Sequence, residues 1–275
     1  MPNNIAYTGP HTMSLIKKRP EDSHKGLFGT LISLTGSRNM TGAAYLSSMG
    51  ALRSGIGLLK LAADIYTQTV LKGCLFEAVF IEPTEINKHT ASAYLVGCGL
   101  GRDTDSLLHD LLPSLKKATV IDADGINFLA ANINVLRSIC GNKNGLILTP
   151  HPTEMGRLIG KDTDFVQADR KGITARFASE YGCVLVLKGM NTVIALPDGS
   201  VAVNTSGNSG LAKGGSGDVL AGVIASLCAQ GYSAADAAVL GVYLHGLAAD
   251  RLVLKHGAHG LLPRDLPAEI GLLLG

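Results

Sequence analysis

The sequence predicts an α/β protein: a three-layer α/β/α sandwich with a mostly parallel central sheet. Short, nearly continuous apolar runs of strand length alternate along the 275 residues with longer segments of helical pattern. Apolar runs without polar alternation are typical of strands buried on both faces. Strands that alternate with helices are typical of a parallel sheet. One segment departs from this alternation and predicts a β-hairpin near the end of the sheet.

The expected elements follow from these patterns in chain order. Strands are expected at Gly29–Gly36, Gly57–Ala63, Ser92–Gly97, Ala118–Asp124, Gly145–Pro150 and Cys183–Gly189. Helices are expected at Thr41–Ser54, Thr104–Leu112, Asp164–Tyr181, Asp218–Gln230 and Ala234–Lys255. The hairpin is expected at Asn191–Asn204, because two apolar runs flank the turn residues Pro197, Asp198 and Gly199.

Composition limits the classes of function. Residues 1–275 are expected to form one domain, because no Pro/Ser-rich linker or charge run divides them. The net charge is +2 with Lys and Arg scattered, so no nucleic acid or membrane partner is indicated. The N-terminus lacks the apolar core of a secretion signal, which predicts a cytoplasmic protein. The five cysteines form no CxxC pair and are interpreted as reduced core thiols.

Gly-rich or polar segments follow the predicted strands, where ligands bind in open α/β sheets. They read "GSRNMTGAA", "GCGLGRD", "DADGIN", "PHPTEM" and "KGMNT". Two familiar phosphate-binding motifs are not matched. No Gly-Lys pair is followed by Ser or Thr, as a P-loop requires, and "GCGLGRD" is one residue short of the dinucleotide spacing. A Rossmann dehydrogenase is therefore disfavoured.

The stretch "NTSGNSGLAKGGSGDVLAG", residues 204–222, predicts a different phosphate site. Gly214, Gly215 and Gly217 can turn backbone N–H groups toward an anion, and the following helix adds the positive end of its dipole. Asp218 then stands where a carboxylate can accept the proton of an attacking hydroxyl. The alternative interpretation makes Asp218 an ordinary helix N-cap after a tight turn.

This stretch resembles the signature of the ribokinase-like superfamily, and the chain is more narrowly similar to the ADP/ATP-dependent NAD(P)H-hydrate dehydratases. The resemblance also rests on these ordered motifs: "SHKGLFGTLISLTGS", "GAAYLSSMGALRSGIGL", "VGCGLGRD", "VIDADGINFL", "LTPHPTEMGRL", "LVLKGMNTVI" and "GLLPRDLP". Small departures are Lys213 and Ser216 where Thr is common, Thr205-Ser206 for Pro-Thr, and Thr153 for Gly. Since Ser216 keeps a hydroxyl, they leave the reaction type unchanged and the nucleotide preference open.

The resemblance implies a lyase of metabolite repair. Its substrates would be the S forms of NADHX and NADPHX, which carry a hydroxyl on C6 of the reduced nicotinamide ring. Phosphorylation of that hydroxyl by ADP or ATP, with Mg²⁺, would be followed by loss of phosphate and recovery of NADH or NADPH. The preference between ADP and ATP, and between the two hydrates, stays open.

The same resemblance assigns roles to residues. Asp218 is the base and a substrate contact, and Gly214, Gly215, Ser216 and Gly217 form the anion hole. The nucleotide segment consists of Lys188, Gly189, Met190, Asn191 and Thr192. In the alternative interpretation, Lys188 is an ordinary solvated charge at the end of a strand.

Four further positions are carried over or noted. His151 would contact the hydrate, although it could merely satisfy backbone groups. Glu154 would organise Mg²⁺ through water, or be a first-turn Glu facing the helix dipole. Ala43 and Gly101 would let the dinucleotide approach the backbone, or be ordinary packing and turn residues.

Asp122 and Asp124, expected at the end of a strand, would shape the site electrostatically without being catalytic.

Partners and competing functions follow from the family. We expect an epimerase on a separate chain that interconverts the R and S hydrates, and a homo-oligomer, with a tetramer favoured. Two other functions remain open. One is a kinase of a small hydroxylated heterocycle, of the hydroxyethylthiazole or hydroxymethylpyrimidine type. The other is a non-catalytic nucleotide sensor, which would have no need of Asp218.

Overall fold

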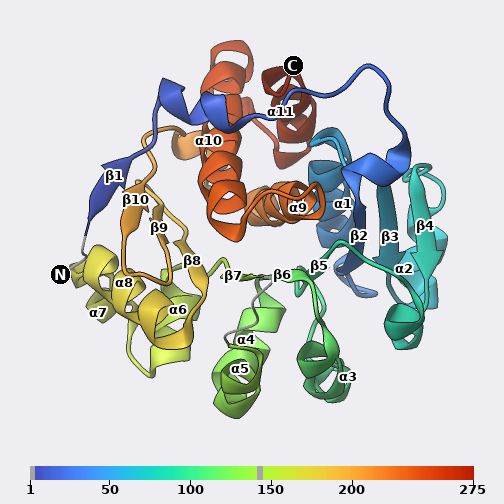
Figure 1. Cartoon of the computed structure of the whole chain (residues 1–275), viewed down its shortest axis with the longest axis horizontal. Coiled ribbons are helices and arrows are strands. Elements are labelled where there is room, and N and C mark those ends of the chain that lie inside the picture. Colours follow the sequence, from blue (N-terminus) through green and yellow to red (C-terminus); the bar gives the residue numbers. More distant parts are fainter. Residues whose placement is uncertain (1–3, 141–144) are drawn as a thin grey trace.

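The computed structural model describes residues 4–140 and 145–275, and its centre is a ten-stranded sheet with helices on both faces (Figure 1). The strand order is β1-β10-β9-β8-β7-β6-β5-β2-β3-β4. Neighbouring strands among the described residues are parallel, except where β9 pairs with β8 and β10. The predicted α/β class, the parallel sheet and the hairpin are confirmed.

All six predicted strands are present, and each is slightly shorter than expected. They are β2 (Thr30–Leu34), β3 (Leu58–Ala62), β5 (Ala93–Val96), β6 (Ala118–Ile121), β7 (Leu146–Leu148) and β8 (Val184–Leu187). The hairpin is formed by β9 (Val193–Ala195) and β10 (Val201–Val203). Sequence patterns missed β1 (Ile5–Tyr7) and β4 (Ala78–Ile81), which are the two edge strands. Edge strands are partly exposed, so their apolar pattern is weak.

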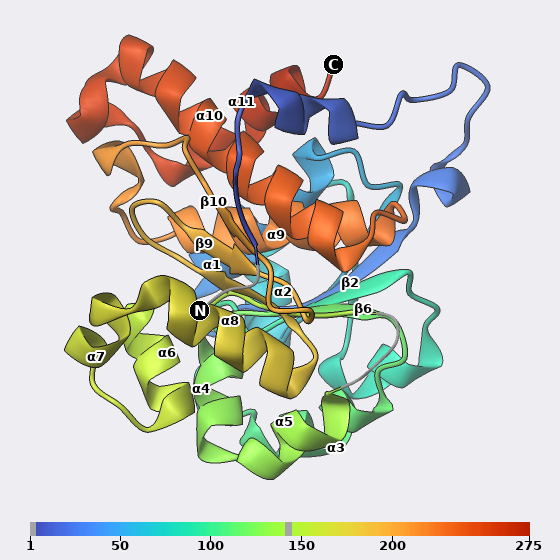
Figure 2. The same cartoon turned by 60° about the vertical axis from the view of Figure 1, so that its left-hand side comes forward.

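The helices divide between the two faces of the sheet (Figures 1 and 2). One face carries α1 (Thr41–Arg53), α9 (Ser216–Ala229), α10 (Ala234–Gly260) and α11 (Leu266–Leu273), with α2 (Ile65–Leu71) beside α1. The other carries α3 (Asp105–Leu111), α4 (Asp124–Ala131), α5 (Ile133–Ile139), α6 (Pro152–Ile159), α7 (Thr163–Ala168) and α8 (Arg170–Tyr181). Short 3₁₀ turns lie at Pro10–Leu15, Lys25–Phe28, Pro83–Lys88, Leu112–Ser114, Ser209–Leu211 and Pro263–Asp265.

The expected helix Asp164–Tyr181 is in fact two helices, so that prediction was wrong in this detail. Asp169 separates α7 from α8 with a non-helical backbone, φ −143° and ψ 60°. Its carboxylate accepts a hydrogen bond from the Gly172 amide at 2.9 Å, which caps α8. An Asp side chain that satisfies a free amide makes a helix start favourable here, and the break turns α8 back along the sheet.

Side chains of the central strands alternate between the two layers, as a pleated sheet requires. In β8, Val184 and Val186 pack into the cluster that includes α9 and α10. Leu185 and Leu187 pack into the opposite cluster, with α4 and α6. Because both faces are covered, the central strands are mostly apolar at successive positions, which explains why their sequences show little polar alternation.

Close contact between α1 and α9 depends on glycine. A Cβ atom on Gly50 would lie 2.5 Å from the carbonyl oxygen of Val219, and one on Gly222 would overlap the carbonyl oxygen of Ser47. The two helix backbones therefore approach more closely than any larger residue permits. This contact fixes where the N-terminus of α9 lies relative to the sheet.

Helix α10 is long and apolar enough, by length and composition, to cross a membrane. Of its apolar window, however, 67% is buried inside the fold. That burial is what a core helix of a layered fold shows, because its apolar face packs on the sheet and on α9.

We expect Gly222→Ala to lower the free energy of unfolding by about 2 kcal/mol, because the new methyl group must push α1 and α9 apart. Urea unfolding followed by circular dichroism measures the change. Gly42→Ala is the matched control, since a Cβ on Gly42 in α1 would meet no atom within 4 Å. Equal stabilities of the two variants would contradict the packing argument.

Candidate active site

A cavity of about 920 Å³ opens at the carboxyl ends of the parallel strands. Its walls come from the turns after β6, β7 and β8, from the segment before α9, and from α10. The lining residues are Asp122, Ala123, His151, Glu154, residues 188–192, 204–209 and 211–218, Leu220, Val242, His245 and Gly246. The fold thus brings the predicted nucleotide segment, the predicted anion hole, His151, Glu154 and Asp218 together.

The glycine segment before α9 has the geometry of an anion cradle. Gly215 occupies the N-cap position with φ 101°, a left-handed conformation, and a Cβ there would overlap the Leu46 side chain. The amide groups of the first turn, which have no partner within the helix, therefore face the cavity with the positive end of the helix dipole. Ser216 Oγ is buried and has no hydrogen-bond partner among the described residues. Such an orphaned hydroxyl suits a bound phosphate.

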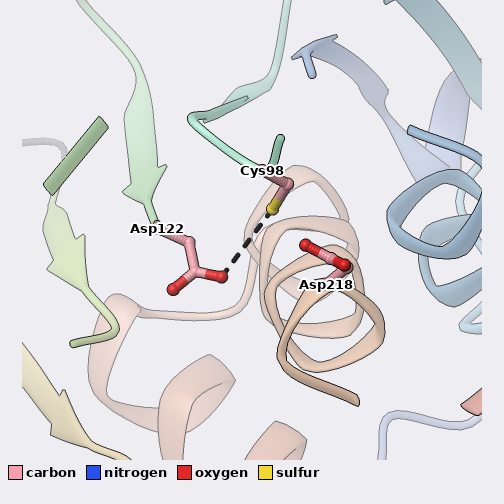
Figure 3. Close-up of side chains that lie close together, drawn as sticks. All are labelled: Cys98, Asp122 and Asp218. Carbon is pink, nitrogen blue, oxygen red and sulfur yellow. Dashed lines mark hydrogen bonds between the residues drawn. The ribbon is translucent and has the colours of Figure 1, made fainter. Parts of the chain in front are cut away.

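Asp218 is the third residue of α9, so the interpretation of Asp218 as the N-cap was wrong. Its carboxylate faces Cys98 and Asp122 across the end of the sheet (Figure 3). Burial, followed by the charge of Asp122, raises the pKa of Asp218 to about 6 against the opposing effect of Lys188. At neutral pH the group is ionised and yet more basic than an ordinary Asp, which is what a general base needs.

Lys188 ties the turns after β6, β7 and β8 together. Its Nζ lies 2.5 Å from Asp122 Oδ1 and 3.9 Å from Glu154 Oε2. Thr149 donates a second hydrogen bond to Asp122 Oδ1 at 2.8 Å. The Lys188 side chain is only 18% exposed, so the alternative of a solvated charge was wrong. Burial opposes the charge of Lys188, but Asp122 and Glu154 outweigh it and raise the pKa.

His151 and Glu154 form a reciprocal cap at the start of α6. His151 Nδ1 accepts hydrogen bonds from the Thr153 and Glu154 amides at 3.1 and 3.3 Å, and Glu154 Oε2 accepts one from the His151 amide at 2.8 Å. Burial and then Lys188 lower the pKa of His151, so the ring is neutral with its proton on Nε2. Burial raises the pKa of Glu154. His151 thus satisfies backbone groups, and Glu154 lies in the first turn of α6, as the alternative interpretations of these two residues expected. Both residues also line the cavity.

Ala43 and Gly101 lie outside the described lining of this cavity. They are nevertheless close to one loop: a Cβ on Gly99 would lie 2.6 Å from Ala43 Cβ. The Gly101 amide donates to Asp124 Oδ2 at 2.8 Å. Asp124 is the first residue of α4 and not a strand residue, because β6 ends at Ile121. The substrate roles of Ala43 and Gly101 stay predictions.

The nucleotide segment is a tight turn held by an arginine that sequence reasoning missed. Arg170, the first residue of α8, donates to the carbonyl oxygens of Met190 at 2.5 Å, Leu187 at 3.0 Å and Lys188 at 3.1 Å. Asn191 has a positive φ of 53°, so the turn is sharp. Met190 is 86% exposed at the rim. No motif distinguishes Arg170 from a surface arginine.

A buried histidine of α10 was also missed. His245 Nε2 lies 3.0 Å from the carbonyl oxygen of Ser216, in the first turn of α9. Burial lowers the pKa of His245 to about 4, so the neutral ring donates this hydrogen bond. Through this hydrogen bond, His245 holds the first turn of α9, next to the glycine cradle, in place. A lone His in an apolar helix gives no sequence signal of such a role.

The fold and this site define the class. A mostly parallel sandwich whose glycine cradle ends in a carboxylate at a helix N-terminus is a ribokinase-like protein. The chain matches the family described as NAD(P)H-hydrate dehydratase over residues 31–271, and it belongs to that family.

Individual relatives agree with this assignment. The chain is 40% identical to the ADP-dependent (S)-NAD(P)H-hydrate dehydratase of Neisseria meningitidis over 268 residues, covering 95% of this chain and 88% of that protein. It is 38% identical to a bifunctional NAD(P)H-hydrate repair enzyme of Moorella thermoacetica in an alignment of 281 positions that covers 96% of this chain but only 52% of that longer protein.

Solved structures place the fold equally firmly. The ADP/ATP-dependent NAD(P)H-hydrate dehydratase of Bacillus subtilis, co-crystallised with ATP and Mg²⁺, has a TM-score of 0.87 and 32% identity, covering 98% of both chains. A hydroxyethylthiazole kinase of Pyrococcus horikoshii has a TM-score of 0.60 with 13% identity, which is similarity of fold alone.

We expect Gly217→Val to weaken ADP and ATP binding at least about tenfold, because the side chain would fill the mouth of the cradle beside Lys188. Titration calorimetry measures the affinity. Gly73→Val is the matched control, because Gly73 lies outside the cavity lining and a Cβ there would come no closer than 4.0 Å to another atom, the Val70 carbonyl oxygen. If both variants bind nucleotide as the wild type does, this loop does not hold phosphate.

Proposed function

We propose that this protein uses ADP or ATP to dehydrate the S forms of NADHX and NADPHX, which returns NADH and NADPH. The observation that carries the proposal is Asp218, a half-buried carboxylate with a raised pKa at the end of the glycine cradle, in the same cavity as residues 188–192. Membership in the NAD(P)H-hydrate dehydratase family supports the choice of substrate.

The chemistry requires a phosphoryl transfer first, because hydroxide is a poor leaving group. Asp218 accepts the proton of the C6 hydroxyl as its oxygen bonds to the terminal phosphorus of the nucleotide, and the bond from that phosphorus to the bridging oxygen breaks. The product is AMP from ADP, or ADP from ATP. The C6–O bond then breaks, phosphate leaves with the electron pair, and the ring nitrogen stabilises the cation. Loss of a proton from the neighbouring carbon restores the reduced nicotinamide.

The chain's own groups stabilise the charge that moves in this transfer. The amides of residues 214–217 and the dipole of α9 hold the transferred phosphoryl group. Lys188 adds a positive charge beside the cradle, near Gly217. The C6 hydroxyl must approach Asp218 from the side of Ala43 and Gly101 if those predicted substrate contacts hold.

Glu154 suits a hydrated Mg²⁺. It is a buried oxygen ligand on the cavity wall, fixed by the His151 amide, and Mg²⁺ prefers oxygen ligands and keeps several waters. Bound with the nucleotide, the ion would neutralise phosphate charge. The structurally similar B. subtilis dehydratase, co-crystallised with ATP and Mg²⁺, supports this part of the proposal.

An epimerase completes the repair, because only the S hydrate is a substrate. The bifunctional repair enzymes among the relatives support this pairing, and this chain spans about half of their length. We further propose that the protein works as a homo-oligomer.

The deciding experiment supplies S-NADHX, Mg²⁺ and either nucleotide and follows absorbance at the NADH band together with free phosphate. We expect NADH and phosphate in equal amounts, with a matching amount of AMP or ADP. A stable phosphorylated product without NADH would instead establish a kinase, and nucleotide binding without any turnover would establish a sensor.

We expect Asp218→Asn to lower turnover by about 10² to 10⁴-fold while affinity for the hydrate changes less. Asp236→Asn is the matched control, because Asp236 occupies the same third position in α10 and lies outside the cavity lining. Near-normal turnover in Asp218→Asn would exclude the base role.

We expect kcat/KM to fall as the pH falls through about 6, because a protonated Asp218 cannot accept the hydroxyl proton.

The same pKa also predicts how the stability of the folded state changes with pH. Since the folded pKa lies above the unfolded value of 3.8, the folded state loses stability as pH rises through this interval. Asp218→Asn should therefore melt at or above the wild-type temperature at pH 7. A lower melting temperature would contradict this sign.

A further inference from the structure

The loop after β5 holds Cys98 in one orientation. Cys98 stands between Gly97, with φ 122°, and Gly99, with φ 63°, two conformations that favour glycine. Its carbonyl oxygen accepts a hydrogen bond from the Gly36 amide at 2.7 Å, which pins the loop to the end of β2. The backbone therefore fixes where the Cys98 side chain points.

The thiol of Cys98 points at the two carboxylates of the site (Figure 3). Cys98 is fully buried, and its S–H group donates a weak hydrogen bond to Asp122 Oδ2, with Sγ 3.8 Å from that oxygen. The Sγ and one carboxylate oxygen each from Asp122 and Asp218 all lie within 4.8 Å of one another. The three residues come from three elements: the loop after β5, the end of β6 and the first turn of α9. This convergence makes Cys98 part of the site although it does not line the cavity.

The two carboxylates differ in how they are stabilised. Asp122 has Lys188 and Thr149 as strong hydrogen-bond donors. For Asp218, burial, Asp122 and Asp124 raise the pKa, whereas Lys188 and a hydrogen bond with the Cys98 thiol lower it. Burial and both carboxylates keep the pKa of Cys98 well above its usual value, so the S–H proton is retained. A thiol has one proton and can serve one carboxylate at a time.

We propose that Cys98 is a positioning residue whose S–H group alternates between Asp122, to which it donates in this structure, and the Asp218 carboxylate, which it holds in place beside the substrate hydroxyl. When Asp218 takes the hydroxyl proton, the S–H group donates to Asp122 alone. The thiol proton itself is not transferred. The link to turnover rests on the proposed function, whereas the effect on Asp218 is a property of the protein alone.

The direct test is the pKa of Asp218, measured by NMR with ¹³C-carboxyl-labelled aspartate, the resonance being assigned with Asp218→Asn. We expect Cys98→Ala to raise this pKa by about 0.5 unit, because one hydrogen bond to the charged form is lost. Cys98→Ser keeps a donor of similar size and should hold the pKa at or below the wild-type value. The acid limb of kcat/KM should move equally, giving about a twofold loss at pH 6 and almost none at pH 8.

Cys228→Ala is the matched control. Cys228 is a buried free thiol of the same helix as Asp218, at the opposite end and outside the site. It should lower the melting temperature without moving the pKa of Asp218. An unchanged pKa in Cys98→Ala, or equal shifts in Cys98→Ala and Cys228→Ala, would overturn the proposal. If Cys98→Ala raises the pKa of Asp218 but the wild-type protein shows no dehydratase turnover, the proposed function is wrong and the positioning role of Cys98 stands.

Discussion

The ion pair between Lys188 and Asp122 is the contact on which the site depends. It joins the ends of β6 and β8, and through Glu154 it reaches the turn after β7. A buried pair of this kind contributes little net stability, because desolvation of both groups offsets their attraction. Its effect is to fix charge. With Asp122 neutralised on one side by Lys188, a second carboxylate can lie within a few ångströms and still ionise.

That second carboxylate arrives on α9, and its place is set by backbone packing remote from the chemistry. Glycines at positions 50 and 222 let α1 and α9 touch backbone to backbone. The N-terminus of α9 therefore reaches the strand ends with the positive end of its dipole at the cavity. The proposed phosphate cradle and the proposed base both depend on this one helix placement, since the cradle leads into the first turn of α9 and Asp218 belongs to that turn.

Sequence reasoning found the parts of the structure that have a local signal. Fully apolar runs located the central strands, and the glycine segment located the cradle and Asp218. It missed β1 and β4, because edge strands bury too little to show a pattern. It also joined α7 to α8, because the cap made by Asp169 becomes visible only when the chain turns there. Arg170 contacts carbonyl groups 17 to 20 positions away in the chain, His245 contacts one 29 positions away, and Cys98 contacts a carboxylate 24 positions away. No rule of sequence spacing connects such pairs.

Residues 204–216 have little regular structure, yet α10 holds them along its length. Ser206 Oγ donates to the Tyr243 carbonyl, the Gly207 amide and Asn208 side chain donate to Asp250, and Lys213 donates to the carbonyls of His259 and Leu261. Helix α10 and the residue after it thus hold this irregular loop in one conformation. Because the loop is ordered when the protein folds, binding a phosphate there costs little conformational entropy. Under the proposed function, the nucleotide phosphates would therefore dock onto a loop that is already in place.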